Sequence, residues 1–308
     1  MKRPATHSLE PEQLFTIASA PRADHYPYQN QRLIIISPYR FAPAPVLLDN
    51  APVKENIIIY EQPLNERIRT FLRLEFLFSQ ASQHLHDESE WGSRNTLNSL
   101  LDILNIFGRT ELKTEVLKEL EKHATKLAKL KSNPDVDTTR LQKTLSELGR
   151  LGNKLHESSG PIAADLKENE FLSGIQQRMA IPGGTCDFDL PGYHYWLQQP
   201  TKQRTRDLAN WLKRFEVIAQ AIQLIVKLIR ESAVVKSITA EAGFFQKSMD
   251  ANHPCQLVRV TVDRKAPYYA EISGGRHRFT VRFLEAPRQD GRVKQTTDDV
   301  NFQLECCI

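Results

Sequence analysis

Apolar and polar residues alternate strictly near the C-terminal end of the chain, between Glu271 and Leu284. Successive side chains of a β-strand point to opposite faces, so the pattern predicts a strand with one buried and one exposed face. The apolar positions are Phe279, Val281 and Phe283, and the polar positions are Arg276, Arg278, Thr280 and Arg282. Gly274 and Gly275 come before the alternation and accept the positive φ of a tight turn. The stretch therefore predicts the second strand of a hairpin that carries a basic stripe.

Three other segments indicate strands of the same kind. Residues 257–262 place three valines on one face and Arg259 on the other, and residues 300–306 alternate in the same way. Residues 56–62 form a short apolar run that ends at Pro63. One wet face on each strand is typical of an antiparallel sheet that packs on one side only. We therefore expect a single small sheet, with residues 56–62 as its additional strand.

Helical spacing of apolar residues runs through the middle of the chain. It predicts a helix capped by Asn65, three helices between residues 97 and 155, and further helices over residues 162–179 and 205–232. Asp137 or Thr138 can cap the last of the three helices. The helix over 205–232 has a broad apolar surface, which either a second layer of the same bundle or a homodimer partner could cover.

These elements predict the α+β fold class, with a helical bundle and a small antiparallel β-domain. The bundle is expected over residues 64–232, and the β-domain over residues 54–63 and 233–308. Residues 1–53 hold eight of the seventeen prolines and no glycine, which is typical of a flexible extension. Translation could instead begin at a GUG codon for Val53, and both interpretations remain open.

Composition adds limits on the chemistry. The chain has 308 residues, of which 40% are hydrophobic and 25% charged, and its net charge is only +4. An anionic partner would therefore have to meet a local patch such as the basic stripe. The four cysteines form no CxxC pair or zinc-binding spacing, so we expect reduced thiols, no metal and no cofactor. No apolar run is long enough to span a bilayer, and we expect a cytoplasmic protein without membrane insertion.

Three blocks of sequence resemble the ZapD family of bacterial division proteins. The first is YEQPLNERIRTFLRLEFL from Tyr60, and the second is FGRTELKTEVLKELEK from Phe107. The third, from Ile181, contains IPGG, FDLP and the His-x-Trp of His194. The resemblance implies a homodimer at the mid-cell Z ring that binds the C-terminal tail of FtsZ and bundles FtsZ filaments. It also implies a partner for the basic stripe.

Guanidinium groups offer several donors in a planar fork, which suits an acidic peptide. We therefore expect the FtsZ tail to contact Arg278, Arg282, Arg276 and Arg259. The basic positions that match the family suggest secondary filament contacts, namely Arg73, Arg109 and His194. The alternatives are a solvated strand face for the stripe and a structural role for His194. At Glu170 an acid stands where a basic residue is expected, so that position is not carried over.

Two other classes of function, nucleic-acid binding and enzymatic catalysis, fit the sequence less well. A single-stranded nucleic-acid-binding protein could use the same stripe, but aromatic side chains should then lie among the arginines, whereas Phe279 and Phe283 alternate to the opposite face. For that reason we expect no nucleic-acid partner. No catalytic residues are assigned, because no nucleophile, base and acid fall in a recognisable arrangement and the loop after Met179 lacks the GK[ST] ending of a phosphate-binding loop. We expect an adaptor, not an enzyme.

Overall fold

The computed structural model describes residues 56–108, 111–134, 136–250, 255–275, 277–285 and 291–308. The chain divides into two units, residues 1–40 and residues 41–308, and every described residue belongs to the second. The expected extension over residues 1–53 and the alternative start at Val53 lie outside the described residues.

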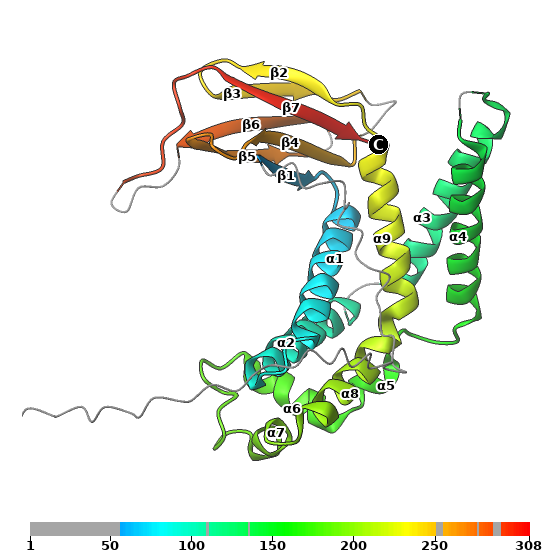
Figure 1. The fold of residues 1–308 in the computed structure, drawn as a ribbon, viewed down its shortest axis with the longest axis vertical. Helices are drawn as coiled ribbons and strands as arrows, with labels where there is room; N and C mark the ends of the chain where they lie inside the picture. Colours follow the sequence, from blue (N-terminus) through cyan, green and yellow to red (C-terminus); the bar gives the residue numbers. More distant parts are fainter. Residues whose placement is uncertain (1–55, 109–110, 135, 251–254, 276, 286–290) are drawn as a thin grey trace, which may run out of the picture. The chain divides into compact units, whose positions relative to one another are not determined.

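The described unit is α+β, as predicted, and its helices precede most of its strands (Figure 1). The helices are α1 (Glu66–Leu85), α2 (Glu90–Phe107), α3 (Leu112–Ala128), α4 (Thr138–Glu157), α5 (Ala164–Lys167), α6 (Glu170–Met179), α7 (Pro191–Leu197), α8 (Thr201–Leu212) and α9 (Glu216–Glu231), with 3₁₀ turns at Lys129–Ser132 and Lys213–Phe215. The strands are β1 (Ile57–Pro63), β2 (Lys236–Ala240), β3 (Phe244–Ser248), β4 (Leu257–Asp263), β5 (Tyr268–Gly274), β6 (Arg278–Glu285) and β7 (Val300–Cys307).

Side-chain caps fix where the longer helices begin. The Asn65 side chain accepts a hydrogen bond of 2.9 Å from the backbone N–H of Ile68, and this cap starts α1 where the sequence predicts it. Asp137 accepts from the backbone of Arg140 at 3.0 Å and starts α4. Such caps satisfy N–H groups that have no partner within the helix.

Two predicted helices are broken in the structure. The helix expected over residues 162–179 is divided into α5 and α6, because Asn169 caps a new helix by accepting from the N–H of Leu172 at 3.0 Å. The helix expected over residues 205–232 begins earlier, at Thr201, and a 3₁₀ turn at Lys213–Phe215 separates α8 from α9. The loop expected after Met179 contains the short helix α7, which has Pro191 in its first turn.

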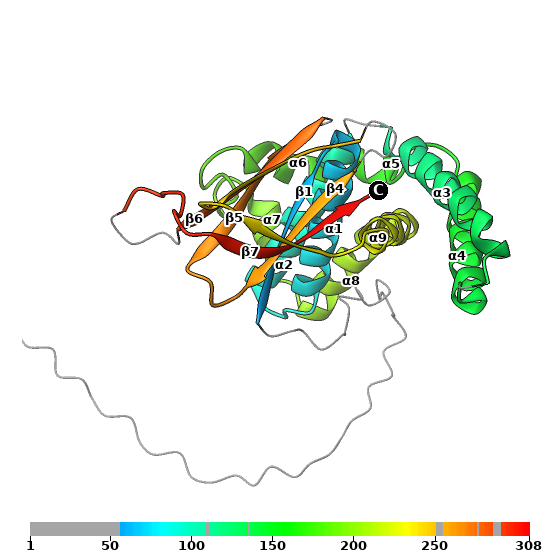
Figure 2. The ribbon, with the colours of Figure 1, turned by 90° about the horizontal axis from the view of Figure 1, so that it is seen from above.

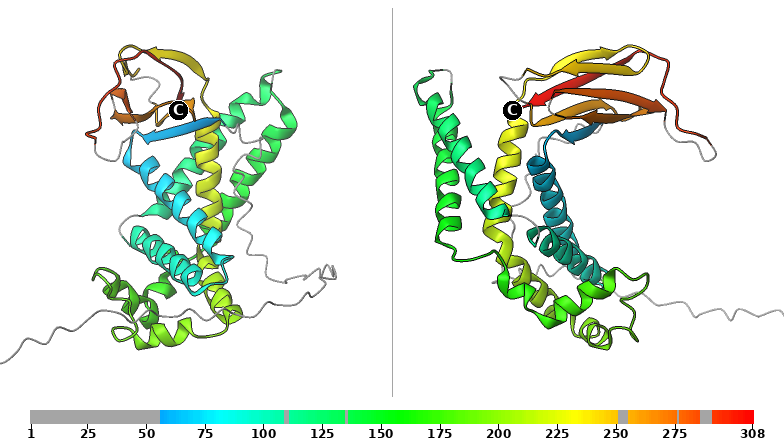
Figure 3. Two further views of the ribbon diagram at one scale, coloured as in Figure 1. Left: turned by 60° about the vertical axis from the view of Figure 1, so that its left-hand side comes forward. Right: turned by 180° about the vertical axis from the view of Figure 1, so that it is seen from behind.

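The broad apolar surface of α9 is used within the chain. This helix packs against α1, α3 and α4 and reaches β7 at its C-terminal end (Figures 1 and 3). Its buried residues face more than one neighbour, and they are Ile218, Ala219, Ala221, Ile222, Ile225, Val226 and Ile229. The second layer of the same bundle, one of the two predicted explanations, therefore accounts for this surface.

The strands form two sheets, and the expectation of a single sheet is wrong. One sheet has the order β1-β4-β7-β2 and is called the helix-facing sheet below. The other has the order β3-β6-β5 and is called the outer sheet. Figure 2 shows the strands from above with α1 and α9 beneath them. β1 pairs antiparallel with β4, so residues 56–62 do supply a strand of the β-domain.

A shared apolar core holds the two sheets together. Phe283 of the outer sheet contacts Phe302 of the helix-facing sheet with ring centroids 5.1 Å apart, and Phe245 contacts Phe302 at 5.6 Å. The predicted inward set Phe279, Val281 and Phe283 is fully buried in this core. Gly274 ends β5 where an added Cβ would lie 2.7 Å from the Cβ of Phe279, so the hairpin needs glycine at this close approach.

Replacement of Phe279 by alanine should strongly destabilise the protein. The ring is fully buried, and its removal leaves a cavity between the sheets, which should lower the free energy of unfolding by about 3–5 kcal/mol. Thr280→Ala on the opposite face is the matched control and should cost less than about 1 kcal/mol. Denaturant unfolding measures both. Equal losses would mean that the two faces of β6 are assigned the wrong way round.

Candidate functional site

One face of the outer sheet is exposed over most of its length, and the strand register defines it. Arg282 of β6 lies opposite Phe244 of β3 and Glu271 of β5. Thr280 and Arg278 follow on the same side because side chains alternate. This surface is called the outer face, and its members are Phe244, Gln246, Ser248, Glu271, Ser273, Arg278, Thr280 and Arg282.

The two arginines of the outer face are both exposed. Arg278 and Arg282 are four residues apart on β6, which separates them by about 13 Å at about 3.3 Å per residue. Arg282 Nη2 lies 3.1 Å from Glu271 Oε2, and about half of each side chain is open to solvent. Among the described residues no ion-pair partner of Arg278 is found. The outer face therefore presents one unengaged guanidinium group and one that is held by an exposed carboxylate.

The sequence analysis missed the aromatic residue of this face. Phe244 is 42% exposed and stands opposite Arg282, at the rim of the sheet. The strand that carries it, β3, has the sequence FFQKS, in which Phe244, Gln246 and Ser248 alternate with inward positions. This short alternation is the sequence pattern that could have placed Phe244 on the exposed face. The outer face thus combines guanidinium, amide, hydroxyl and apolar groups.

Arg259 does not belong to the outer face. It lies on β4 in the helix-facing sheet, between Glu61 on β1 and Glu305 on β7 in the strand register. Its Nε is 2.9 Å from Glu61 Oε1, and its Nη1 is 3.1 Å from each oxygen of Glu305. Only 18% of its side chain is exposed. Two carboxylates already engage this guanidinium group. The prediction that Arg259 lies on a solvent-exposed face is therefore wrong, because that face of β4 is turned to the helices.

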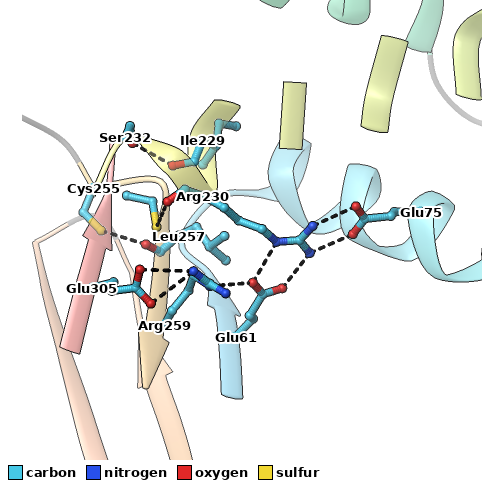
Figure 4. Close-up of polar contacts among 10 residues, drawn as sticks. Glu61, Glu75, Ile229, Arg230, Ser232, Cys255, Leu257, Arg259 and Glu305 are labelled. Atoms are coloured by element: carbon cyan, nitrogen blue, oxygen red, sulfur yellow. Dashed lines mark hydrogen bonds and ion pairs between the residues drawn. The ribbon is translucent and has the colours of Figure 1, made fainter. Parts of the chain in front are cut away.

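The pairing extends from Arg259 into the helices (Figure 4). Arg230 of α9 has Nη2 at 2.8 Å from Glu61 Oε2 and at 2.7 Å from Glu75 Oε2 of α1. The junction network is the chain of five alternating charges Glu305, Arg259, Glu61, Arg230 and Glu75. Burial raises the pKa of Glu61, but its hydrogen bonds and ion pairs with Arg230 and Arg259 outweigh burial and hold the pKa below the ordinary value.

The other predicted contacts lie apart from the outer face. Arg73 is exposed on α1, and His194 is exposed on α7. His194 also lines an open hollow of about 470 Å³ together with Trp91, Arg94 and Tyr193. Arg276 and Arg109 lie outside the described residues. Of the five predicted site residues that the structure describes, it brings Arg278 and Arg282 together on one exposed surface, and Arg259, Arg73 and His194 lie elsewhere.

The described residues contain no group of three His, Cys, Asp or Glu side chains that is arranged to hold a metal ion. Within the same residues, no helix is both long enough and apolar enough to cross a membrane.

Comparisons with known proteins place this chain in a family. The family model for ZapD, described as a cell division protein, matches residues 72–282. The chain belongs to the ZapD family. Proteins named cell division protein ZapD are similar over most of their length, and that of Methylococcus capsulatus is 42% identical over 254 residues, which cover 82% of this chain and 99% of the relative.

Two further ZapD proteins are similar over the same region. That of Coxiella burnetii is 38% identical over 251 residues, covering 81% of this chain and 97% of the relative. That of Escherichia coli O17:K52:H18 is 34% identical over 250 residues, covering 81% and 98%. The protein therefore has a role in cell division. Its ZapD relatives are named for that role and for no reaction.

Neutralising Glu61 should make the free energy of unfolding change less with pH in the acidic range. The carboxylate has a lowered pKa, so its stabilising effect is complete above the ordinary value of 4.5 and is lost as the pH falls through the folded-state value. Glu61→Gln should lower the free energy of unfolding by about 1–3 kcal/mol at pH 7, because both arginines keep only one carboxylate each. The difference from the unmodified protein should shrink below pH 4.5.

Glu147→Gln is the matched control. Glu147 pairs with Arg150 at 2.6 Å on the exposed side of α4, where an ion pair contributes less than about 1 kcal/mol. Denaturant unfolding at several pH values compares the two variants. A loss for Glu61→Gln that is as small as that of the control would show that the junction network adds little to stability.

Proposed function

We propose that this protein is an adaptor that binds the C-terminal tail of FtsZ on the outer face and, as a homodimer, crosslinks FtsZ filaments at the mid-cell Z ring. Membership of the ZapD family supports the choice of partner. The observation that carries the proposal is the pair of exposed arginines, Arg278 and Arg282, on one open strand face. Arg276, two residues before this strand in the sequence, remains a predicted tail contact, whereas Arg259 is left out because carboxylates engage it.

An extended acidic peptide suits the spacing of these groups. Hydrogen bonds between guanidinium and carboxylate are charge-assisted and directional, and two such contacts about 13 Å apart would fix the direction of the peptide. The pair between Arg282 and Glu271 is exposed, so exchanging Glu271 for a tail carboxylate costs little. Phe244 could take up an apolar residue of the tail beside Arg282.

Crosslinking does not require a tight single site. A flexible tail loses conformational entropy when it binds, which weakens each contact. Two sites in one dimer that act on a polymer raise the apparent affinity through effective concentration. Arg73, Arg109 and His194 are proposed secondary contacts with the filament. An adaptor of this kind performs no chemical reaction.

One structural observation favours the nucleic-acid alternative. The sequence analysis argued against it because aromatic residues alternate away from the arginines, but Phe244 stands on the outer face opposite Arg282. A base could stack on this ring while a guanidinium group contacts a phosphate. Filter binding with single-stranded DNA and RNA separates the two functions. Tight binding that falls steeply with added salt would favour the alternative.

Reversing either arginine should weaken binding of the FtsZ tail. Arg278→Glu or Arg282→Glu removes charge-assisted hydrogen bonds and adds repulsion, so the dissociation constant should rise about ten- to hundredfold. The melting temperature should be unchanged, because both side chains are exposed. Fluorescence anisotropy with a labelled tail peptide measures the affinity, and pull-down of full-length and tail-deleted FtsZ tests the partner.

The chain offers two matched controls for these reversals. Arg140 also forms an exposed ion pair, at 3.0 Å with Glu231, but on α4, so Arg140→Glu should leave tail binding unchanged. Glu271→Gln frees Arg282 and should strengthen tail binding a few-fold. Equal weakening by Arg140→Glu and the outer-face reversals would contradict a specific site there. Capture of tail-deleted FtsZ as efficiently as full-length FtsZ would contradict tail binding altogether.

The dimer is tested separately. Light scattering coupled to size exclusion should give twice the chain mass of 35.3 kDa. A dimer is required because one tail site per molecule cannot bridge two filaments. If the mass is that of one chain at concentrations that bundle filaments, crosslinking needs a second site on the same chain instead.

A further inference from the structure

Three cysteines gather where the helix-facing sheet meets the end of α9. Cys306 and Cys307 are consecutive residues of β7, and Cys255 comes two residues before β4. In the strand register Cys306 lies opposite Val258, so it faces the core between the two sheets. Cys307 lies opposite Leu257 and faces the helices. Alternation along β7 therefore places Cys306 and Cys307 in different surroundings.

Cys306 has a thiol and an amine beside it. The Nζ atom of Lys247, on β3, is 3.6 Å from the Cys306 sulfur. The buried Cys255 thiol donates to the carbonyl of Leu257 at 3.2 Å, and Cys255 belongs to the apolar core against which Cys306 packs. Cys306 itself is only half-buried. One partly exposed cysteine and one buried cysteine therefore share this core.

The surroundings of Cys306 favour its thiolate form. A hydrogen bond from Cys255 lowers the pKa of Cys306, burial raises it, and the charges of Lys247 and of Lys236 on β2 lower it further, to about 6. The hydrogen bond with Cys306 and burial raise the pKa of Cys255, and the charge on Cys306 raises it further, which favours its thiol form. Of the two cysteines, Cys306 is therefore the readier nucleophile.

We propose that Cys306 is a site of oxidation by hydroperoxides and that Cys255 resolves the oxidised cysteine as a disulfide. The proposal rests on the packing of both cysteines in one core and on the amine of Lys247 at 3.6 Å from the Cys306 sulfur, and it is independent of tail binding.

The chemistry balances with a hydroperoxide as the only oxidant. The Cys306 thiolate attacks one peroxide oxygen, an S–O bond forms, the O–O bond breaks, and the leaving oxygen takes a proton from solvent. Cys255 then attacks the sulfenic sulfur, an S–S bond forms, and the departing hydroxide takes the proton of Cys255 to give water. Two electrons pass from the two thiols to the peroxide.

The other two cysteines provide internal comparisons. Cys307 is fully buried, and burial raises its pKa to about 12, so it should stay inert. Cys186 lies in the loop before α7 and donates to the Asp189 carboxylate at 3.3 Å. It is partly exposed, but among the described residues neither a lysine nor a second thiol is found in hydrogen-bonding contact with it. Only Cys306 combines access, a cation and a resolving thiol.

Oxidation would act at the connection between the strands and the helices. The backbone N–H of Ile308 donates to the Ser232 hydroxyl at 2.8 Å, directly after α9, and Cys307 Sγ lies 4.0 Å from the Arg230 carbonyl. A bond from Cys306 to Cys255 would join the end of β7 to the segment before β4. It would restrict the unfolded chain and should raise the melting temperature.

The test begins with the reduced full-length protein and needs no substitution. The rate of iodoacetamide alkylation at each cysteine is followed by peptide mass spectrometry across a range of pH. The rate at Cys306 should reach half its maximum near pH 6 and level off above it. At pH 7 it should exceed that of an ordinary thiol about three- to sixfold, because the larger thiolate fraction outweighs the lower nucleophilicity of a low-pKa thiolate. A rate that still climbs steeply at pH 8 would overturn the proposal.

Hydrogen peroxide then tests the second step. The unmodified protein should yield the linked Cys255–Cys306 peptide, and Cys255→Ala should instead leave a sulfenic acid at Cys306 that dimedone traps. Lys247→Met should move the half-maximal pH of alkylation upward, whereas Lys247→Arg should preserve it. Oxidation of Cys186 with Cys306 left intact, or oxidation of Cys306 to the sulfinic acid with no linked peptide from the unmodified protein, would refute the pair.

Discussion

The structure depends on one constraint, which is that the helix-facing sheet packs on both of its faces where it meets the helices. Valines of β4 enter the core between the sheets, while Leu257 and Cys307 enter the core of the helical bundle. The polar part of the same face carries the junction network, in which Arg259 and Arg230 alternate with three carboxylates. Partly buried charges are tolerated there because each has an opposite charge beside it. Arg259 is held in this network, and the exposed pair of arginines, Arg278 and Arg282, lies on the outer sheet.

Much of the local structure could be predicted from the sequence because it depends on neighbours in the chain. Alternation around Phe279 gave the correct faces of β6, and Asn65 and Asp137 cap helices as expected. The role of Arg259 could not be predicted in this way. Its partners Glu61 and Glu305 are far away in sequence, and alternation separates two faces without saying which one another element will cover. The breaks around α6 and α8 were missed because short caps and 3₁₀ turns leave the apolar period almost intact.

The sequence therefore predicted the two arginines of the candidate site but not the residues beside them. Arg278 and Arg282 lie on an exposed face, as the pattern indicated, but their neighbours Phe244 and Glu271 come from β3 and β5, which are short strands with weak patterns. Glu271 changes the electrostatics, because it offsets one of the two positive charges. An anion meets a full guanidinium charge at Arg278 and has to displace a carboxylate at Arg282. Such a surface favours modest affinity and rapid exchange with an anionic partner.

The same alternation separates the two basic groups of adjacent strands. Lys247 lies opposite Phe279 in the register of β3 and β6, so it turns inward, whereas Arg278, one residue along β6, turns outward. The inward amine lies 3.6 Å from the Cys306 sulfur, and the outward guanidinium remains available to an anionic partner. The two-residue alternation of side chains thus directs Lys247 toward the Cys306 thiol and Arg278 toward the outer face. A slip of one residue in this pairing would turn Lys247 outward and Arg278 inward. The amine beside Cys306 and the guanidinium group on the outer face would then both be lost, so both proposals depend on the register.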